Sequence, residues 1–208
     1  MCENVTSENG FFRFDIVTKK GLYTSCRLSV PGFHNVSNAL AAAAAAYVSD
    51  VPGEAVKRGL EAFRGVKRRF EYRGVCGDMQ VFDDYAHHPD EIRATLSSAK
   101  NLGYEKITVV FQSHTYSRTK AYWKDFIDAL SLADEVIHMD IYPAREAPIE
   151  GITAEAMADQ SPNGRYLGSA DQIAEYLIRS REKGLLIVMG AGDVVNLTDR
   201  ILTDNKTV

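Results

Sequence analysis

Hydrophobic and polar residues alternate in two short runs near the start of the chain, at 11–17 and 22–28. The residues between them end in Gly21, which can adopt the positive φ of a tight turn, so the pattern predicts a β-hairpin. Two helices are predicted next. The first is an alanine-rich stretch at about 36–48, and the second, at 54–63, has its apolar residues on one face.

After about residue 68, strand-like runs alternate with helical patterns. The predicted strands are 81–83, 107–111, 135–141, 165–168 and 185–189, and the predicted helices are about 89–102, 120–132, 153–160, 170–182 and 193–203. The runs at 107–111 and 185–189 are apolar on both faces, which is typical of a parallel sheet covered by helices on both sides. The alternation predicts a doubly wound, Rossmann-like α/β domain over residues 68–208.

Residues 1–67 are predicted to be a separate unit. A hairpin and two helices bury too little surface to make a good independent core. Such a segment either docks on the α/β domain or is the tail of a larger domain, and we favour the second interpretation.

Composition narrows the class of protein. The net charge of −4 argues against a nucleic-acid partner, because nucleic-acid binders usually carry a basic patch. The longest apolar stretch, 39–48, is about half of the roughly 20 residues that a membrane span needs, and no signal peptide is expected at the start. The three cysteines have no ligand-like spacing, which favours a reduced, cytoplasmic protein.

Two loops that follow predicted strands are rich in reactive side chains, at 83–91 and 112–119. In an open parallel sheet, ligands bind at the carboxyl ends of the strands. Pro89 suits the first turn of a helix, whose free N–H groups favour an anion. Arg118 could hold a carboxylate or phosphate through two parallel hydrogen bonds.

Other features have a simpler interpretation beside the functional one. Asp83 and Asp84 could be solvated turn residues. The adjacent His87 and His88 cannot easily face one metal ion, so a histidine metal centre is disfavoured. The turn at 190–193 resembles part of a dinucleotide fingerprint but lacks its third glycine, which favours a packing role. No P-loop motif occurs in the chain.

Four motifs then occur in order: PGFHNVSNALAA at 31–42, RRFE at 68–71, DDYAHHP at 83–89 and VFQSHTYSRT at 110–119. Together they resemble the Mur ligase family, and the resemblance runs from about residue 11 to 202. It implies that 1–67 is the C-terminal remnant of a central, P-loop, ATP-binding domain. It also implies that 68–208 is a C-terminal Rossmann-like domain that binds the amino acid.

Within the family, the Tyr-Ala-His-His-Pro form is similar to members that join L-alanine to UDP-N-acetylmuramate in peptidoglycan precursor synthesis. The resemblance implies an ATP- and Mg²⁺-dependent ligation through an acyl phosphate. The P-loop and the main Mg²⁺ ligands are expected outside this chain. We therefore expect no catalytic residue and no metal ligand within it, and an isolated chain without activity.

The positions of the four motifs indicate which residues of this chain correspond to the binding residues of the family. The resemblance implies ATP-binding residues at His34, Asn35, Asn38, Arg69 and Asp84, and amino-acid-binding residues at Tyr85, His87, His114 and Arg118. Asn35 could also cap the alanine-rich helix. Some relatives carry a second arginine where this chain has Thr115, so Arg118 is expected to share its anion with neighbouring groups.

Two other functions remain open at this point. One is a metal-dependent phosphoesterase that uses Asp83, Asp84, His87 and His88. The other is a catalytically silent module that binds a nucleotide or a protein partner. Stoichiometric Zn²⁺ or Mn²⁺ would favour the phosphoesterase.

Overall fold

The computed structural model describes residues 1–180 and 182–204. The chain divides into two compact units, which are described separately. Unit 1 is Met1–Gly65 with Asn101–Gly103, and unit 2 is Val66–Lys100 with Tyr104–Val208.

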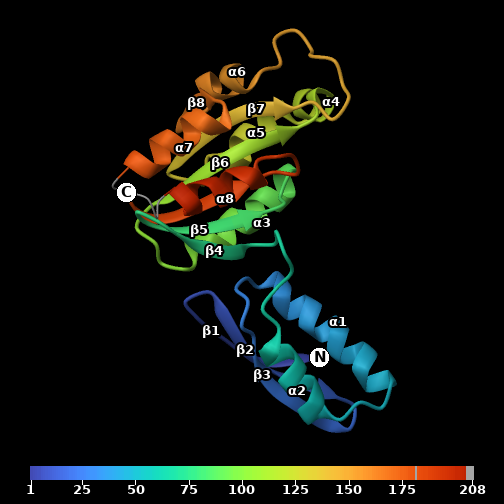
Figure 1. Ribbon diagram of the computed structural model, residues 1–208. Helices are drawn as coiled ribbons and strands as arrows, with labels where there is room; N and C mark the ends of the chain where they lie inside the picture. The colour runs from blue at the N-terminus through green and yellow to red at the C-terminus, as the bar shows by residue number, and fades with distance from the viewer. Residues whose placement is uncertain (181, 205–208) are drawn as a thin grey trace. The chain divides into compact units, whose positions relative to one another are not determined.

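Unit 1 is a three-stranded antiparallel sheet with two helices (Figure 1). Its elements are β1 (Cys2–Glu8), β2 (Phe11–Thr18), β3 (Gly21–Arg27), α1 (His34–Val48) and α2 (Gly53–Ala62). Alternation along β2 and β3 buries Phe14, Ile16 and Cys26 in one cluster with Val36 of α1 and Val56 of α2. The predicted hairpin and both helices are confirmed. The strand β1 was missed, because its sequence is almost wholly polar and exposed.

Unit 2 is a six-stranded sheet in the order β4-β5-β9-β6-β7-β8. The strands are β4 (Glu71–Cys76), β5 (Asp78–Asp84), β6 (Ile107–His114), β7 (Glu135–Tyr142), β8 (Gly164–Gly168) and β9 (Lys183–Met189). Five strands are parallel, and β4 pairs antiparallel with β5 at one edge. The last strand of the chain, β9, therefore lies inside the sheet, between β5 and β6.

Helices cover both faces of this sheet (Figure 1). They are α3 (Pro89–Lys100), α4 (Tyr116–Ala121), α5 (Trp123–Leu130), α6 (Ala154–Gln160), α7 (Ala170–Arg179) and α8 (Val195–Asp204). Successive strand residues point to opposite sides, so Val109 packs with α3 and α5 while Val110 packs with α7 and α8. The predicted doubly wound α/β fold is confirmed.

Two predictions about unit 2 need correction. The helix expected at 120–132 is two helices, α4 and α5, separated at Tyr122, where φ is −112°. The edge strand β4 was not predicted. Among the described residues, no helix combines the length and the apolar character that crossing a membrane requires.

Candidate functional site

Aromatic rings line the carboxyl edge of the sheet in unit 2. The ring of Tyr85, after β5, lies 5.2 Å from that of His87, and His87 lies 6.2 Å from His114 at the end of β6. The row ends on Tyr142 of β7, whose ring stacks on His114 at 5.5 Å. The two predicted loops therefore meet, although β9 separates their strands.

Several buried polar atoms in this region have no hydrogen-bond partner among the described residues. They include Nη1 of Arg118 and Nδ1 of His114. Burial lowers the pKa of His114, and the positive charge of Arg118 lowers it further, so both effects favour the neutral imidazole. A buried donor left unpaired costs free energy, and such groups commonly serve a ligand.

The backbone that carries Arg118 is strained and firmly held. Thr115 has φ of 71°, which is rare for a β-branched residue. Its N–H donates to the carbonyl of Tyr142 at 2.9 Å, and its hydroxyl accepts from the N–H of Arg118 at 3.4 Å as the cap of α4. The strain at Thr115 supports a functional role for this turn.

The loop after β7 is tied to α4 by Glu146. Its carboxylate accepts hydrogen bonds from Ser117, from N–H at 2.8 Å and from Oγ at 2.5 Å. These bonds lower the pKa of Glu146. Ala144 and Arg145, in the same loop, have φ of 44° and 81°. The residues Tyr142–Arg145 line a hollow of about 500 Å³. Sequence reasoning missed this loop, whose one available signal was its position directly after a strand.

Asp83 is fully buried and lies 3.5 Å from Nε of Arg68 and 3.5 Å from Nη1 of Arg73. Burial raises its pKa against the lowering effect of the two arginines. The Arg68 guanidinium also lies 4.7 Å from the centroid of the Tyr85 ring and donates to the carbonyl of Gly190 at 2.7 Å. Asp83 therefore helps to orient Arg68 against Tyr85.

Asp84 is 5% exposed, and backbone N–H groups hold both of its oxygens. Phe70 donates at 2.8 Å and Ala86 at 2.7 Å. Burial raises the pKa of Asp84. The interpretation of Asp83 and Asp84 as solvated turn residues is thus wrong. The other predicted nucleotide contact in unit 2, Arg69, is exposed, with its guanidinium 5.8 Å from the Tyr85 ring.

The two adjacent histidines contact different neighbours. Nδ1 of His87 lies 2.9 Å from the carbonyl of Tyr85, while the His88 ring lies 4.7 Å from the Tyr122 ring. Within residues 1–180 and 182–204, no three His, Cys, Asp or Glu side chains are grouped so that they could hold a metal. No observation favours the metal-dependent phosphoesterase.

Three predicted nucleotide residues lie in the first turns of α1, in unit 1. Asn35 does not cap this helix, because the N-cap is Phe33. The Asn35 amide instead donates to the carbonyl of Pro31 at 2.7 Å and accepts from Nδ2 of Asn38 at 3.1 Å. His34 and Asn38 are exposed. Asn35 thus orients Asn38 on the outer side of the helix.

The glycine turn after β9 is packed against protein. A Cβ on Gly190 would lie 2.7 Å from the carbonyl oxygen of Gln112, and one on Gly192 would lie 2.7 Å from Cγ of Tyr142. The predicted packing role of this turn is confirmed. It also sets the position of Tyr142, whose ring stacks on His114.

Comparison with known proteins gives a family match. The sequence pattern of the family described as "Mur ligase, glutamate ligase domain" matches residues 68–192. The chain belongs to the Mur ligase family. That match spans the two loops that hold Tyr85, His87, His114 and Arg118.

Relatives from the same family match nearly the whole chain. The UDP-N-acetylmuramate–L-alanine ligase of Acetivibrio thermocellus is 42% identical over 207 residues, covering 97% of this chain and 44% of that protein. The enzyme of the same name from Agathobacter rectalis is 45% identical over 181 residues, covering 85% and 39%. The crystal structure of the UDP-N-acetylmuramate–alanine ligase of Thermotoga maritima matches with a TM-score of 0.80 and 30% identity, covering 99% of this chain and 45% of that one. The chain thus spans less than half the length of each.

Proposed function

We propose that this chain forms part of an ATP-dependent ligase that joins L-alanine to UDP-N-acetylmuramate, in the cytoplasm, during peptidoglycan precursor synthesis. The observation that carries the proposal is that Nη1 of Arg118 and Nδ1 of His114 are buried at the carboxyl edge of the sheet with no hydrogen-bond partner among the described residues. The names of the relatives support the choice of substrates.

In this proposal, residues 68–208 are the amino-acid-binding domain. Arg118 binds the carboxylate of alanine, because a guanidinium matches the geometry of a carboxylate. His114, in its neutral form, can accept a hydrogen bond from the amino group without repelling it. Tyr85 and His87 form the wall of the pocket next to His114.

Residues 1–67 are, in this proposal, the end of the ATP-binding domain. The exposed His34 and Asn38 side chains, with Asn35 behind them, suit the donor and acceptor edge of adenine. Arg69 and Asp84 are proposed as nucleotide contacts of unit 2. ATP would supply the phosphoryl group that activates the muramyl carboxylate. The resemblance to the family assigns the main Mg²⁺ ligands to groups outside this chain, and Mg²⁺ would neutralise the phosphate charge during the transfer.

A chimera tests the proposal. The chain is joined to the part of the Acetivibrio thermocellus ligase that it does not cover, and alanine- and UDP-N-acetylmuramate-dependent ADP release is measured. We expect activity from the chimera and none from the chain alone. Turnover by the chain alone, or a chimera that folds and binds ATP but never uses alanine, would contradict the proposal.

The role of Arg118 is tested in the same chimera. Loss of a hydrogen-bonded charge pair costs about 1.5–3 kcal/mol, so Arg118→Ala should raise the KM for alanine roughly ten- to a hundredfold. The KM for ATP should stay within about twofold of the parent value. Lys120→Ala, which removes an exposed positive charge from the same helix, is the control. Equal rises in both KM values would contradict the assignment of Arg118 to the alanine pocket.

A further inference from the structure

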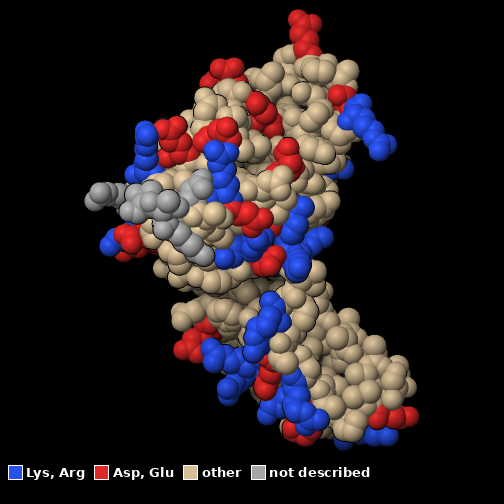
Figure 2. Space-filling view, viewed as in Figure 1, with Lys and Arg blue, Asp and Glu red and all other residues tan. Residues whose placement is uncertain are grey.

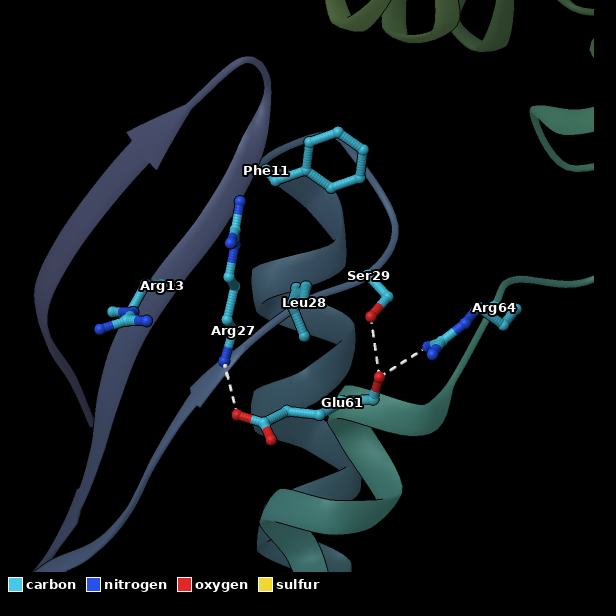
Figure 3. A pocket seen from close by; sticks show the side chains of 7 residues that line it. All are labelled: Phe11, Arg13, Arg27, Leu28, Ser29, Glu61 and Arg64. Carbon is cyan, nitrogen blue, oxygen red and sulfur yellow. Dashed lines mark hydrogen bonds between the residues drawn. The ribbon is translucent and has the colours of Figure 1, made fainter.

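Unit 1 contains a hollow of about 570 Å³ that has no part in the proposed function (Figure 3). Its walls come from β2, β3, the segment after β3 and the end of α2. Three arginines line it, Arg13, Arg27 and Arg64, together with Glu61 and the ring of Phe11. A hollow of this volume is within the range of small-molecule sites.

Two of these arginines stand directly opposite each other. Arg13 of β2 and Arg27 of β3 are partners in the antiparallel register. Both are exposed, while their strand neighbours Phe14 and Cys26 are buried, so the two guanidinium groups share the outer face of the sheet. Like charges placed opposite each other destabilise a sheet. A pair of residues that lowers the stability of a fold is often found at a functional site, where a bound ligand can offset the repulsion.

The positive charge of the hollow is poorly neutralised. Within the part of the chain that the structure describes, the side chain of Arg13 makes no hydrogen bond or ion pair, although its backbone is paired in the sheet. Arg27 has one ion pair, at 3.6 Å, with the exposed Glu8. The carboxylate of Glu61 accepts from the backbone N–H of Arg27 at 3.3 Å, and Arg64 donates to the backbone carbonyl of Glu61 at 2.6 Å. Neither bond pairs a guanidinium with the Glu61 carboxylate.

We propose that this hollow binds a small molecule that carries two or more linked phosphate groups. Guanidinium groups bind phosphate oxygens in pairs, and three of them from separate segments suit an anion larger than one phosphate. In Figure 3 the Arg27 side chain extends toward Phe11, with Arg13 on the neighbouring strand. Lys and Arg side chains also gather on the face of unit 1 shown in Figure 2.

The test is a calorimetric titration of the 208-residue chain with tripolyphosphate and with pyrophosphate, at 150 mM KCl. Neither probe has an adenine, and the substitutions at Arg13 and Arg27 leave Arg69 and Arg118 unchanged, so a loss of binding in these variants is assigned to the hollow. We expect saturable binding to one site, with Kd rising at least tenfold in Arg13→Gln and in Arg27→Gln. Arg58→Gln, which removes an exposed charge of α2 outside the hollow, should change Kd less than twofold.

Thermal unfolding without ligand checks that the variants fold. Arg13→Gln should leave the Tm unchanged or higher, because it removes the like-charge pair, while abolishing the rise in Tm that tripolyphosphate gives the parent chain. Equal weakening by all three substitutions would indicate a diffuse electrostatic effect and overturn the proposal. Binding of citrate as tight as that of tripolyphosphate would overturn the preference for phosphate, and absence of saturable binding would overturn the site.

Discussion

Gly192 links the turn after β9 to the candidate pocket, and Gly192→Ala tests that link. Its new Cβ would lie 2.7 Å from Cγ and 2.8 Å from Cβ of Tyr142, and against Oε1 of Gln112. Neither neighbour can move freely. Gln112 is 2% exposed, donates to Asp193 at 2.7 Å and accepts from the N–H of Val194 at 3.0 Å. Tyr142 is held by its stack on His114.

The cost follows from these contacts. Overpacking costs about 1–3 kcal/mol, and loss of the bond from Val194 to Gln112 adds about 1 kcal/mol. We expect a total of about 3 kcal/mol, which lowers the Tm of a domain this size by roughly 6–12 °C. The fluorescence of Trp123, the one tryptophan of the chain, reports the unfolding of unit 2.

The matched control is Gly151→Ala. Gly151 has φ of +75° and open space around its Cβ position, so alanine there costs only the left-handed backbone term of about 1–2 kcal/mol. Gly192 has no such φ, so its cost comes from crowding alone. If Gly192→Ala destabilises unit 2 no more than Gly151→Ala does, then Tyr142 and Gln112 do not crowd the Cβ position of residue 192 as described.

Two further predictions concern histidines. Burial lowers the pKa of His138 from 6.5 to about 4, so between these values the unfolded chain binds the extra proton. From pH 7 to pH 5, His138 should therefore reduce the free energy of unfolding by about 2 kcal/mol, measured by urea denaturation. A His138→Leu variant with the same pH dependence as the parent would disprove this. Separately, Arg118→Gln should raise the pKa of His114, observed by NMR titration of its ring protons, because it removes a nearby positive charge. An unchanged or lower pKa would show that Arg118 does not face His114.

The elements that could be predicted are those in which the local pattern of apolar and polar residues indicates the secondary structure. The runs at 107–111 and 185–189 are apolar on both faces, and they are the buried strands β6 and β9. The position of β9 between β5 and β6 was not predictable, because strand order depends on pairing between distant segments. The strand β4 lies at an edge and has an irregular register near Gly74, so its sequence shows little alternation.

The candidate site was predictable in part for a similar reason. Reactive side chains stand out when they follow an apolar strand, which is how the loops holding His87 and Arg118 were found. The contribution of Tyr142 depends on a stack with His114, and that of Arg68 on a buried Asp83, neither of which any local pattern encodes.

The central place of β9 also bears on how unit 2 is made. A ribosome synthesises β5 and β6 well before residues 183–189, yet these two strands are joined only through β9. During translation, both strands have an open edge that exposes unpaired backbone groups to other chains. Unit 2 therefore completes its sheet only when the last strand emerges, and a nascent chain stalled before residue 183 should be a substrate for chaperones and prone to aggregation.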